Sequence, residues 1–243
     1  MRIFRYTITF SFLIVYLILP FQHAAGQNNF DPNFIISDNE LQDYSSMSRD
    51  DIQTFLQNKG SYLSSYQALS ESGTTKYAAD LIYDAAQMYR INPKFLLVTL
   101  QKEQSLIVDD APTQKQLDWA TGYAVCDSCQ ISDPKVQKFK GFGMQVANAA
   151  GIMRWYYENK DVKTYILKKD IPAFINQRSI TPASWATAFL YTYTPHVHGN
   201  ENFWKIWQNW FSQVYPNGTL LQSPSSTDVW LLQDGKKRRF TSH

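Results

Sequence analysis

The sequence predicts a mainly α-helical protein with a small β-hairpin appendage at its carboxyl end. Three observations support this fold class. Apolar residues recur at helical spacing in several segments between residues 48 and 215. From residue 216 to 243 the pattern changes to short apolar runs separated by turn residues, which is typical of β-structure. The first 26 residues form a separate, strongly apolar leader.

The amino terminus has the pattern of a signal peptide. Arg2 and Arg5 precede an apolar run from Tyr6 to Phe21, and the small residues of Ala24–Gly26 suit signal peptidase. We therefore expect residues 1–26 to be removed and the mature chain to be secreted or held in the cell envelope, without a stable membrane anchor. A retained anchor is the alternative, but polar residues and a proline interrupt the run, which is short for a spanning helix.

The first part of the mature chain combines irregular and helical patterns. Residues 27–47 are polar, and we expect them to be irregular. A helix should run from Arg49 to Lys59, because Ser48 is a good N-cap and Asp51 stands at the capping-box position. The Ser-rich stretch Ser61–Thr75 predicts a loop.

Two consecutive helices are predicted next. Apolar residues recur at helical spacing from Ala78 to Tyr89. The second helix lies within residues 91–107, where Asn92 is a good N-cap and Pro93 fits the first helical position. Its long apolar run leads to one acidic side chain, Glu103.

Glu103 is the principal candidate for a functional residue. Leu96 and Thr99 precede it by seven and four residues and share its helix face, so Glu103 should emerge from the core at a rim or a cleft floor. Burial raises the pKa of a carboxyl group, so a glutamate here is either neutralised by a partner or kept protonated for proton transfer. The alternative is a solvated glutamate at a frayed helix end.

The middle of the chain carries a long segment without periodicity. Asp109–Lys140 predicts a loop, and loops of this length in compact domains are usually functional or disordered. Trp119 and Tyr123 argue against disorder. Helical patterns then resume in three segments, which are Gln145–Tyr157, Pro182–Tyr193 and Asn202–Val214.

The chain has only two cysteines, Cys126 and Cys129, and both lie in this loop. In an exported protein the simplest outcome is a local disulfide that braces the loop. A redox site would need a strand before the pair and a helix after it, and neither pattern is present. A zinc site with His196 and His198 is a third interpretation, although the spacing of these histidines is not the usual helical one. We expect no metal and no cofactor.

The pattern of the carboxyl-terminal segment predicts β-structure. This segment is either a hairpin that packs on the helical part or the first piece of a longer repeat. Three short runs surround the turn pair Asp234–Gly235; they are Thr219–Gln222, Val229–Leu232 and Arg238–Phe240. Lys236–Arg239 would give this segment a basic edge, or would serve as a solvated charge run that discourages edge pairing.

Charge and composition restrict the class of ligand. Removal of residues 1–26 takes away two of the 23 Lys and Arg and none of the 21 Asp and Glu, which leaves 21 of each sign. A formally neutral chain argues against nucleic acid, whose binding requires a basic face. Aromatic residues make up 15% of the chain. Their rings are suited to stacking on sugars, although most of them should fill the core. We expect a monomer that binds a hydroxyl-rich polymer.

Three motifs resemble the lysozyme-like superfamily, in particular lytic transglycosylases and glucosaminidase-like peptidoglycan hydrolases. Their catalytic helix ends in a hydrophobic run followed by Glu-Ser, and here Gln104 separates Glu103 from Ser105. Gly141–Gln145 resembles the Gly-Leu-Met-Gln phrase that follows the catalytic glutamate in this superfamily. Ala188–Tyr193 resembles the superfamily's tyrosine-containing helix. The resemblance covers roughly residues 75 to 214. The stretches LLVTLQKEQSLI and LDWATGY, with the cysteine pair, also resemble exported bacterial proteins thought to be wall hydrolases.

The resemblance implies cleavage of β-1,4 glycosidic bonds in peptidoglycan, with Glu103 as general acid. It also implies binding roles, in which Gln145 lines the cleft, Tyr191 or Tyr193 orients Glu103, and Thr121 and Tyr123 contact the glycan. Lytic transglycosylases use a single glutamate and the C6 hydroxyl of the substrate. If a second carboxylate takes part, the nearest candidates in sequence are Asp109, Asp110 and Asp118.

A non-catalytic module is the competing interpretation. An exported domain could keep the lysozyme-like fold and bind cell-wall glycan through its aromatic residues and its carboxyl-terminal β-segment. The departure from Glu-Ser and the lack of an obvious second acid leave this alternative open.

Overall fold

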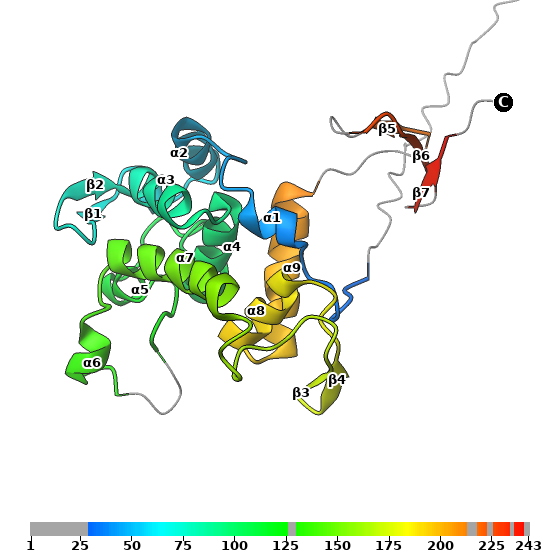
Figure 1. The fold of residues 1–243 in the computed structure, drawn as a ribbon. Helices are drawn as coiled ribbons and strands as arrows, with labels where there is room; N and C mark the ends of the chain where they lie inside the picture. Colours follow the sequence, from blue (N-terminus) through cyan, green and yellow to red (C-terminus); the bar gives the residue numbers. More distant parts are fainter. Residues whose placement is uncertain (1–28, 126–129, 213–217, 223–225, 234–235, 241–243) are drawn as a thin grey trace, which may run out of the picture. The chain divides into compact units, whose positions relative to one another are not determined.

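The computed structural model describes residues 29–125, 130–212, 218–222, 226–233 and 236–240. The chain divides into two units, one formed by Asn29–Gln213 and one that joins Met1–Asn28 to Val214–His243. The described helices belong to the first unit, and a small sheet belongs to the second (Figure 1). The predicted signal peptide and the predicted disulfide of Cys126 and Cys129 lie outside the described residues.

The first two helices begin with local hydrogen-bonded caps. Helix α2 spans Arg49–Asn58, close to its predicted limits, and it has the predicted capping box of Ser48 and Asp51. Helix α1, Asp38–Gln42, has a capping box of the same kind and lies within the segment that was expected to be irregular. Both starts follow from a serine followed three residues later by an acidic residue.

The expectation of a loop over Ser61–Thr75 was partly wrong. This stretch contains a short 3₁₀ helix, η1, at Tyr62–Ser64. Strand β1, Gln67–Leu69, then pairs antiparallel with β2, Thr75–Tyr77. Strands of three residues are too short to show an alternating pattern in the sequence, which explains why the hairpin was not predicted.

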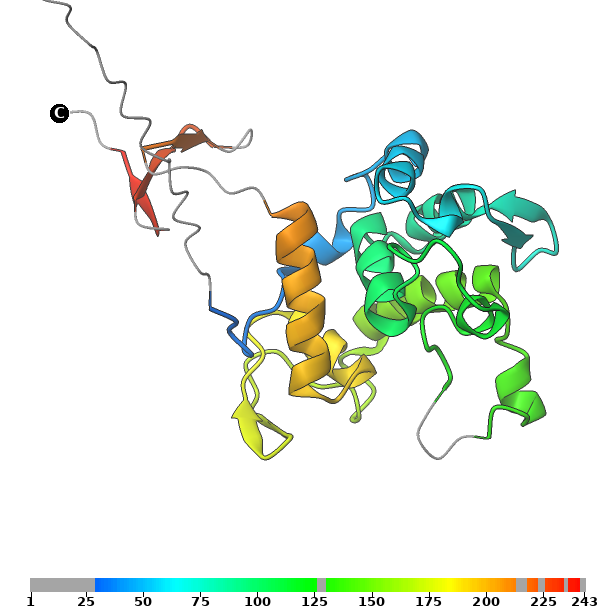
Figure 2. The same cartoon turned by 180° about the vertical axis from the view of Figure 1, so that it is seen from behind.

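The two helices that lead to Glu103 have the predicted positions. Helix α3 spans Ala78–Tyr89, and α4 spans Pro93–Gln104. The Asn92 side chain caps α4 by accepting a hydrogen bond from the backbone N–H of Lys94, at 2.8 Å. All residues of Phe95–Leu100 are buried, because α4 packs against α3, α7 and α9 at the centre of the helical unit (Figures 1 and 2).

The long segment Asp109–Lys140 contains two short helices in place of one continuous loop. They are α5, Gln114–Asp118, and α6, Pro134–Gln137. Helices of four or five residues carry no readable period, so only their caps could have indicated them. Thr113 caps α5 within a capping box, and Asp133 caps α6.

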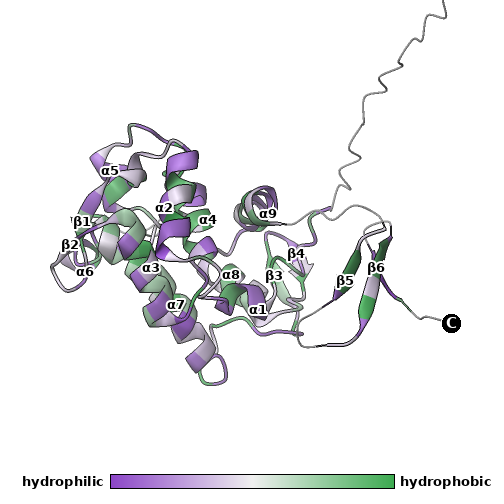
Figure 3. Cartoon of the chain, turned by 90° about the horizontal axis from the view of Figure 1, so that it is seen from above, coloured by the Kyte–Doolittle hydropathy of each residue, from purple (hydrophilic) through white to green (hydrophobic). Residues whose placement is uncertain are grey.

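Three longer helices complete the helical unit. They are α7 (Phe142–Asn159), α8 (Trp185–Tyr193) and α9 (Val197–Phe211). Helices α7 and α9 start earlier than predicted, whereas α8 starts later because Ser184 caps it. In α9, Phe203 and Trp207 are buried and face the core. Figure 3 shows polar and apolar residues side by side on α2 and α7, as expected of helices that cover a core.

The backbone of helix α7 lies close to the backbone of the β1–β2 hairpin. A Cβ atom on Gly143 would lie 2.1 Å from the carbonyl oxygen of Leu69. No larger residue fits at this position without a backbone shift, so the glycine allows the helix and the hairpin to pack closely.

A second hairpin was not predicted. Strand β3, Ala173–Ile175, pairs antiparallel with β4, Arg178–Ile180. The two residues between them, Asn176 and Gln177, have positive φ values of 46° and 62°. Two-residue hairpin turns require such values, but they usually contain a glycine, and the sequence has none here.

The beginning of the helical unit is tied to α8 and to the segment before it. We refer to residues 33–38 as the N-terminal strap. Hydrogen bonds of 2.7–3.0 Å join it to residues 181–187, about 150 positions later. The bonded pairs are Asn33 with Thr181 and Ala183, Ile35 with Thr187, Ile36 with Ser184, and Asp38 with Ala186.

The carboxyl-terminal segment forms β-structure as predicted, with three strands where a hairpin was expected. The strands are β5 (Leu220–Gln222), β6 (Val229–Gln233) and β7 (Lys236–Arg239), in an antiparallel sheet of that order. The side chains of β7 are exposed, and Arg239 pairs with Asp228 at 2.6 Å. The predicted Asp234–Gly235 turn lies outside the described residues.

None of the helices in the described ranges has both the length and the apolarity that crossing a bilayer requires.

Candidate functional site

Glu103 lies in the last turn of α4, at the point where this buried helix reaches the surface. Leu96 and Thr99 on the same face are buried, whereas the side chain of Glu103 is 27% exposed. The helix ends at Gln104 because Ser105 adopts the left-handed conformation, with a φ of 59°. The carboxylate therefore emerges at a rim, as the sequence predicted.

The Glu103 carboxylate has a charged neighbour, although the helix that carries it is largely apolar. Lys102 contacts Glu103 through its ammonium group, which lies 2.5 Å from Oε1. The Lys102 side chain is only 9% exposed, and it also donates a hydrogen bond to the Thr194 hydroxyl at 3.1 Å. One oxygen of the carboxylate is thus held by a nearly buried cation.

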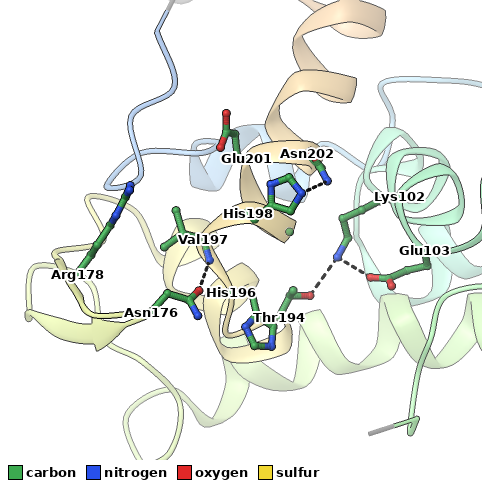
Figure 4. A pocket seen from close by; sticks show the side chains of 11 residues that line it. Lys102, Glu103, Asn176, Arg178, Thr194, His196, Val197, His198, Glu201 and Asn202 are labelled. Carbon is green, nitrogen blue, oxygen red and sulfur yellow. Dashed lines mark hydrogen bonds and ion pairs between the residues drawn. The ribbon is translucent and has the colours of Figure 1, made fainter. Parts of the chain in front are cut away.

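A pocket of about 640 Å³ opens beside this ion pair (Figure 4). The end of α4 provides Lys102 and Glu103, and the β3–β4 hairpin provides Asn176 and Arg178. Most of the remaining lining comes from the start of α9 and the residues before it. These are Thr194, His196, Val197, His198, Gly199, Glu201 and Asn202. We refer to Thr194–Asn202 as the pocket wall.

The hairpin and the pocket wall are joined by one short hydrogen bond. Asn176 accepts it through Oδ1 from the backbone N–H of Val197, at 2.8 Å (Figure 4). This N–H is one of the unpaired donors at the start of α9, so Asn176 acts as a cap that comes from another element. The turn of the hairpin and the start of the helix are thereby positioned together.

The charged and polar side chains of the pocket are exposed or partly exposed, and several of them have few partners. Glu201 pairs with Lys205 at 2.7 Å, and the hydrogen bond from Lys205 lowers the pKa of that carboxyl. His198 faces Asn202 at 3.4 Å between the two side-chain nitrogens. Within the described part of the chain, Arg178 makes no side-chain hydrogen bond and no ion pair. This side of the site therefore presents groups that a ligand can reach.

A loop on another side of Glu103 is held by Gln145. The Oε1 atom of Gln145 accepts hydrogen bonds from the backbone N–H groups of Thr121 and Tyr123, at 3.3 and 3.0 Å. Its Nε2 atom donates to the carbonyl oxygens of Tyr123 and Phe139, at 3.1 and 2.8 Å. Gln145 is 0% exposed, and every hydrogen-bonding position of its amide faces the protein. We refer to Trp119–Val125 as the loop wall.

Tyr193 fixes the same loop from α8. Its hydroxyl donates a hydrogen bond to the carbonyl oxygen of Thr121 at 3.0 Å. Burial raises the pKa of Tyr193, and the nearby Glu103 carboxylate adds to this effect. The hydroxyl therefore stays protonated and remains a donor at neutral pH.

Gly122 is the residue of the loop wall that meets Glu103. Its φ is +67°, a conformation that favours glycine. A Cβ atom at this position would lie 3.4 Å from Oε2 of Glu103. The second oxygen of the carboxylate thus lies on the side of Gly122 where a side chain would stand.

The structure changes the roles expected for several predicted residues. Gln145 and Thr121 are buried, and the N–H and hydroxyl groups of Thr121 donate hydrogen bonds to Gln145. These two residues therefore shape the loop and are not available to a ligand. Tyr191 is also buried; its hydroxyl has no hydrogen-bond partner among the described residues, and burial raises its pKa to about 12. Tyr123 is half-buried and packs edge-on against Phe139. Tyr193 lies close enough to Glu103 for this carboxylate to add to its raised pKa, but its hydroxyl donates to Thr121, so its expected role in orienting Glu103 stays a prediction.

None of the aspartates suggested as a second acid lines the pocket. Asp109 accepts hydrogen bonds from Ala111 and Gln116, and Asp118 pairs with Lys140 at 3.3 Å. Asp110 is likewise absent from the lining. The second carboxylate of the pocket is Glu201, which sequence analysis missed, although its i,i+4 spacing from Lys205 could have marked an exposed helix face.

Lys102 and Arg178 were also missed. Lys102 is the direct neighbour of Glu103, and adjacent residues on a helix do not normally face each other, so the pattern gave no indication of a pair. Arg178 belongs to the hairpin that was not predicted. Among the described residues, no group of three or more His, Cys, Asp or Glu side chains could hold a metal ion.

Comparison with protein-family models shows a match to the description "LasA, N-terminal domain" over residues 34–225. This range begins in the N-terminal strap, contains the entire site and extends past β5. No curated protein and no solved structure matches the chain. Since the model covers most of the sequence, the chain belongs to the family of LasA N-terminal domains.

Proposed function

We propose that this protein is an exported glycosidase that cleaves β-1,4 bonds in peptidoglycan, with Glu103 as the general acid. One observation carries the proposal. A partly exposed glutamate stands at the end of a buried helix, between a polar pocket and a rigidly held loop. General acid catalysis requires a carboxyl group that is fixed in place and still accessible to the substrate.

The two oxygens of Glu103 suit different tasks. Lys102 holds Oε1, so Oε2 is the atom from which a proton can pass to a ligand. When that proton reaches the glycosidic oxygen, the bond from this oxygen to the sugar C1 breaks, and the electron pair remains on the leaving oxygen. Glu103 is then a carboxylate, and it can take a proton from the attacking hydroxyl, either a water molecule or the C6 hydroxyl of the sugar.

The arrangement of three sequence motifs supports the likeness to the lysozyme-like superfamily. Glu103 lies in the last turn of α4, Gln145 lies in the first turn of α7, and Tyr193 is the last residue of α8. The last two residues bind the same loop, and that loop contacts the first residue. Residues from three motifs, far apart in the chain, thus contribute to one site.

Export is part of the proposal. Residues 1–26 have the composition of a signal peptide, and the mature chain is formally neutral. An enzyme of this kind would meet its polymer outside the cytoplasm, where cell-wall glycan is accessible.

A binding module without catalysis is the second candidate, and the ion pair of Lys102 and Glu103 favours it. A carboxylate that is neutralised by a neighbouring ammonium can serve as part of a polar surface for sugar hydroxyls. The remaining lining of the pocket, with exposed imidazole, amide and guanidinium groups, also suits binding.

Digestion of purified peptidoglycan separates the two candidates. The wild-type protein, Glu103→Gln and Glu201→Gln are incubated with the polymer, and the masses of the soluble products are measured. We expect fragments from the wild type and none from Glu103→Gln. Anhydro ends, which lack one water relative to reducing ends, would indicate attack by the C6 hydroxyl.

The Glu201→Gln variant tests the second carboxylate in the same pocket. If Glu201 acts as base or nucleophile, its loss stops cleavage as well; if the substrate supplies the nucleophile, cleavage continues. Full cleavage by a folded Glu103→Gln protein would refute the proposal. If no variant releases fragments but all of them pellet with the wall, the binding module is the correct interpretation.

A further inference from the structure

The loop wall leaves an unfilled position next to the Glu103 carboxylate. At Gly122, the three atoms nearest to an added Cβ are Oε2, Cδ and Cγ of Glu103, at 3.4, 3.6 and 3.9 Å. Gly122 itself is half-buried. An atom placed there would lie close to hydrogen-bonding distance from Oε2.

The two carboxylate oxygens of Glu103 differ in their partners. Oε1 is bound by the ammonium group of Lys102 at 2.5 Å. Oε2 accepts no hydrogen bond from the residues that the structure describes. The oxygen without a partner is the one that faces Gly122.

The loop is too firmly held to give way around a larger residue. Thr121 and Tyr123, on the two sides of Gly122, are both bound by the buried amide of Gln145. The carbonyl group of Thr121 is also bound by Tyr193. The N–H of Gly122 itself donates to the carbonyl oxygen of Trp119 at 3.1 Å. A side chain at position 122 would therefore fill the space beside Oε2.

We propose that Gly122 is a specificity-determining residue, whose missing side chain leaves the space that the glycosidic oxygen and its neighbouring ring atoms occupy beside Oε2 of Glu103. This inference rests on the proposed function. The glycan strand would pass from the pocket across Glu103 to the loop wall. The proton would move from Oε2 to the glycosidic oxygen in that space, and the bond from C1 to this oxygen would break with its electron pair on the oxygen.

The chain offers a matched control for the backbone strain of a substitution. Gly60 has a φ of +66°, almost the same as Gly122, and a Cβ atom there would meet nothing within 4 Å. Gly122→Ala and Gly60→Ala therefore force an alanine into the same unfavourable conformation. Only Gly122→Ala adds a methyl group next to Glu103.

The experiment compares both variants with the wild type in three measurements. They are the melting temperature, the rate of peptidoglycan digestion, and the binding of peptidoglycan in a Glu103→Gln background. We expect similar losses of melting temperature for the two variants. We expect digestion and binding to fall about tenfold or more for Gly122→Ala alone, the effect typical of one misplaced methyl group in a substrate site.

A second pair of variants covers the case in which Gly122→Ala does not fold. Asparagine tolerates positive φ better than alanine does, so Gly122→Asn and Gly60→Asn keep the comparison with less strain. Binding and digestion by Gly122→Asn or Gly122→Ala at the level of the matched Gly60 variant would overturn the inference and leave the proposed function intact. A wild-type protein that neither binds nor digests peptidoglycan would overturn both.

Discussion

The loop wall and the pocket wall face the same glutamate, but they are built in opposite ways. The loop wall is held by the buried side chain of Gln145 and by the partly buried side chain of Tyr193. The pocket wall carries exposed polar side chains, several with one weak partner or none. A site of this kind separates two tasks, since one wall defines the shape of the space and the other provides groups for contact.

The difference explains which residues a sequence motif can reveal. A buried amide that must reach four backbone groups allows no other residue at its position, so Gln145 stands within a recognisable phrase. Exposed side chains of the pocket such as Arg178 and His198 obey no such geometric requirement. The motifs therefore identified the rigid side of the site, and the structure was needed for the accessible side.

The largest expected effect comes from removing the support of the loop wall. Gln145→Ala leaves the N–H groups of Thr121 and Tyr123, and the carbonyl groups of Tyr123 and Phe139, without this partner. The first of these groups is buried and the others are partly buried. Since an unsatisfied buried group costs about 1–3 kcal/mol, we expect the four losses together to lower the free energy of unfolding by about 3 kcal/mol. Chemical denaturation measures this value.

Gln57, which is exposed on α2, provides the control for that substitution. Gln57→Ala should change the free energy of unfolding by less than about 0.5 kcal/mol, as most surface substitutions do. Equal effects of the two substitutions would mean that the loop wall is not held by Gln145.

Two lysines test the contrast between buried and exposed ion pairs. Lys102→Met removes a nearly buried partner of Glu103 and a donor to Thr194. We expect it to lower the free energy of unfolding by about 2 kcal/mol, within the range for hydrogen bonds to charged groups. Lys205→Met breaks the exposed pair with Glu201 and should cost about 0.5 kcal/mol or less.

Thermal and urea unfolding of both lysine variants give the comparison. A loss for Lys102→Met no greater than that for Lys205→Met would show that the Glu103 pair contributes no more than an ordinary surface pair. The contrast between a fixed carboxylate oxygen and a free one would then no longer hold.

Two tyrosines on α8 should respond in opposite directions to the loss of the hydroxyl group. Tyr193→Phe removes the hydrogen bond to Thr121 and should destabilise the protein by about 1 kcal/mol. Tyr191→Phe removes a buried hydroxyl without a described partner, and should stabilise the protein by about 1 kcal/mol. The melting temperatures of the two variants show whether each substitution stabilises or destabilises the protein. A loss of stability for Tyr191→Phe would indicate that its hydroxyl has a hydrogen-bond partner.

The smallest expected effect comes from removing the hydrogen bond between the β3–β4 hairpin and the pocket wall. Asn176→Gly keeps the positive φ of the turn but removes the hydrogen bond to Val197, so the expected loss is about 0.5–1 kcal/mol. Gln177→Gly relieves the strain at the neighbouring position and should be neutral or slightly stabilising. The difference in melting temperature between the two variants measures the cap, and equal values would refute it.

Local chemistry made much of the fold predictable. The capping box of Ser48 and Asp51, the cap at Asn92 and the apolar periods of α3 and α4 marked helices that the structure contains. Short elements escaped prediction. The β1–β2 and β3–β4 hairpins have strands of three residues, and α5 and α6 have fewer than two full turns, so neither period becomes visible.

The candidate site was predictable only in part. The helix pattern was sufficient to place Glu103 at a rim, because burial of one helix face follows from the order of apolar residues. The partner Lys102 and the pocket lining could not be derived, since they depend on how α9 and the β3–β4 hairpin meet α4 in space. The burial of Gln145 reversed its expected role, because a polar side chain can satisfy all of its hydrogen bonds within the protein.

The N-terminal strap has a consequence for the order in which the chain assembles. Its hydrogen bonds reach residues about 150 positions downstream, so the strap cannot close until α8 has been synthesised. Contacts this distant carry a loop-closure cost that delays them relative to the local helix pairs. The strap would therefore stay unpaired while most of the helical unit is made. The amino-terminal end of this unit would thus be the last part of it to be fixed in place.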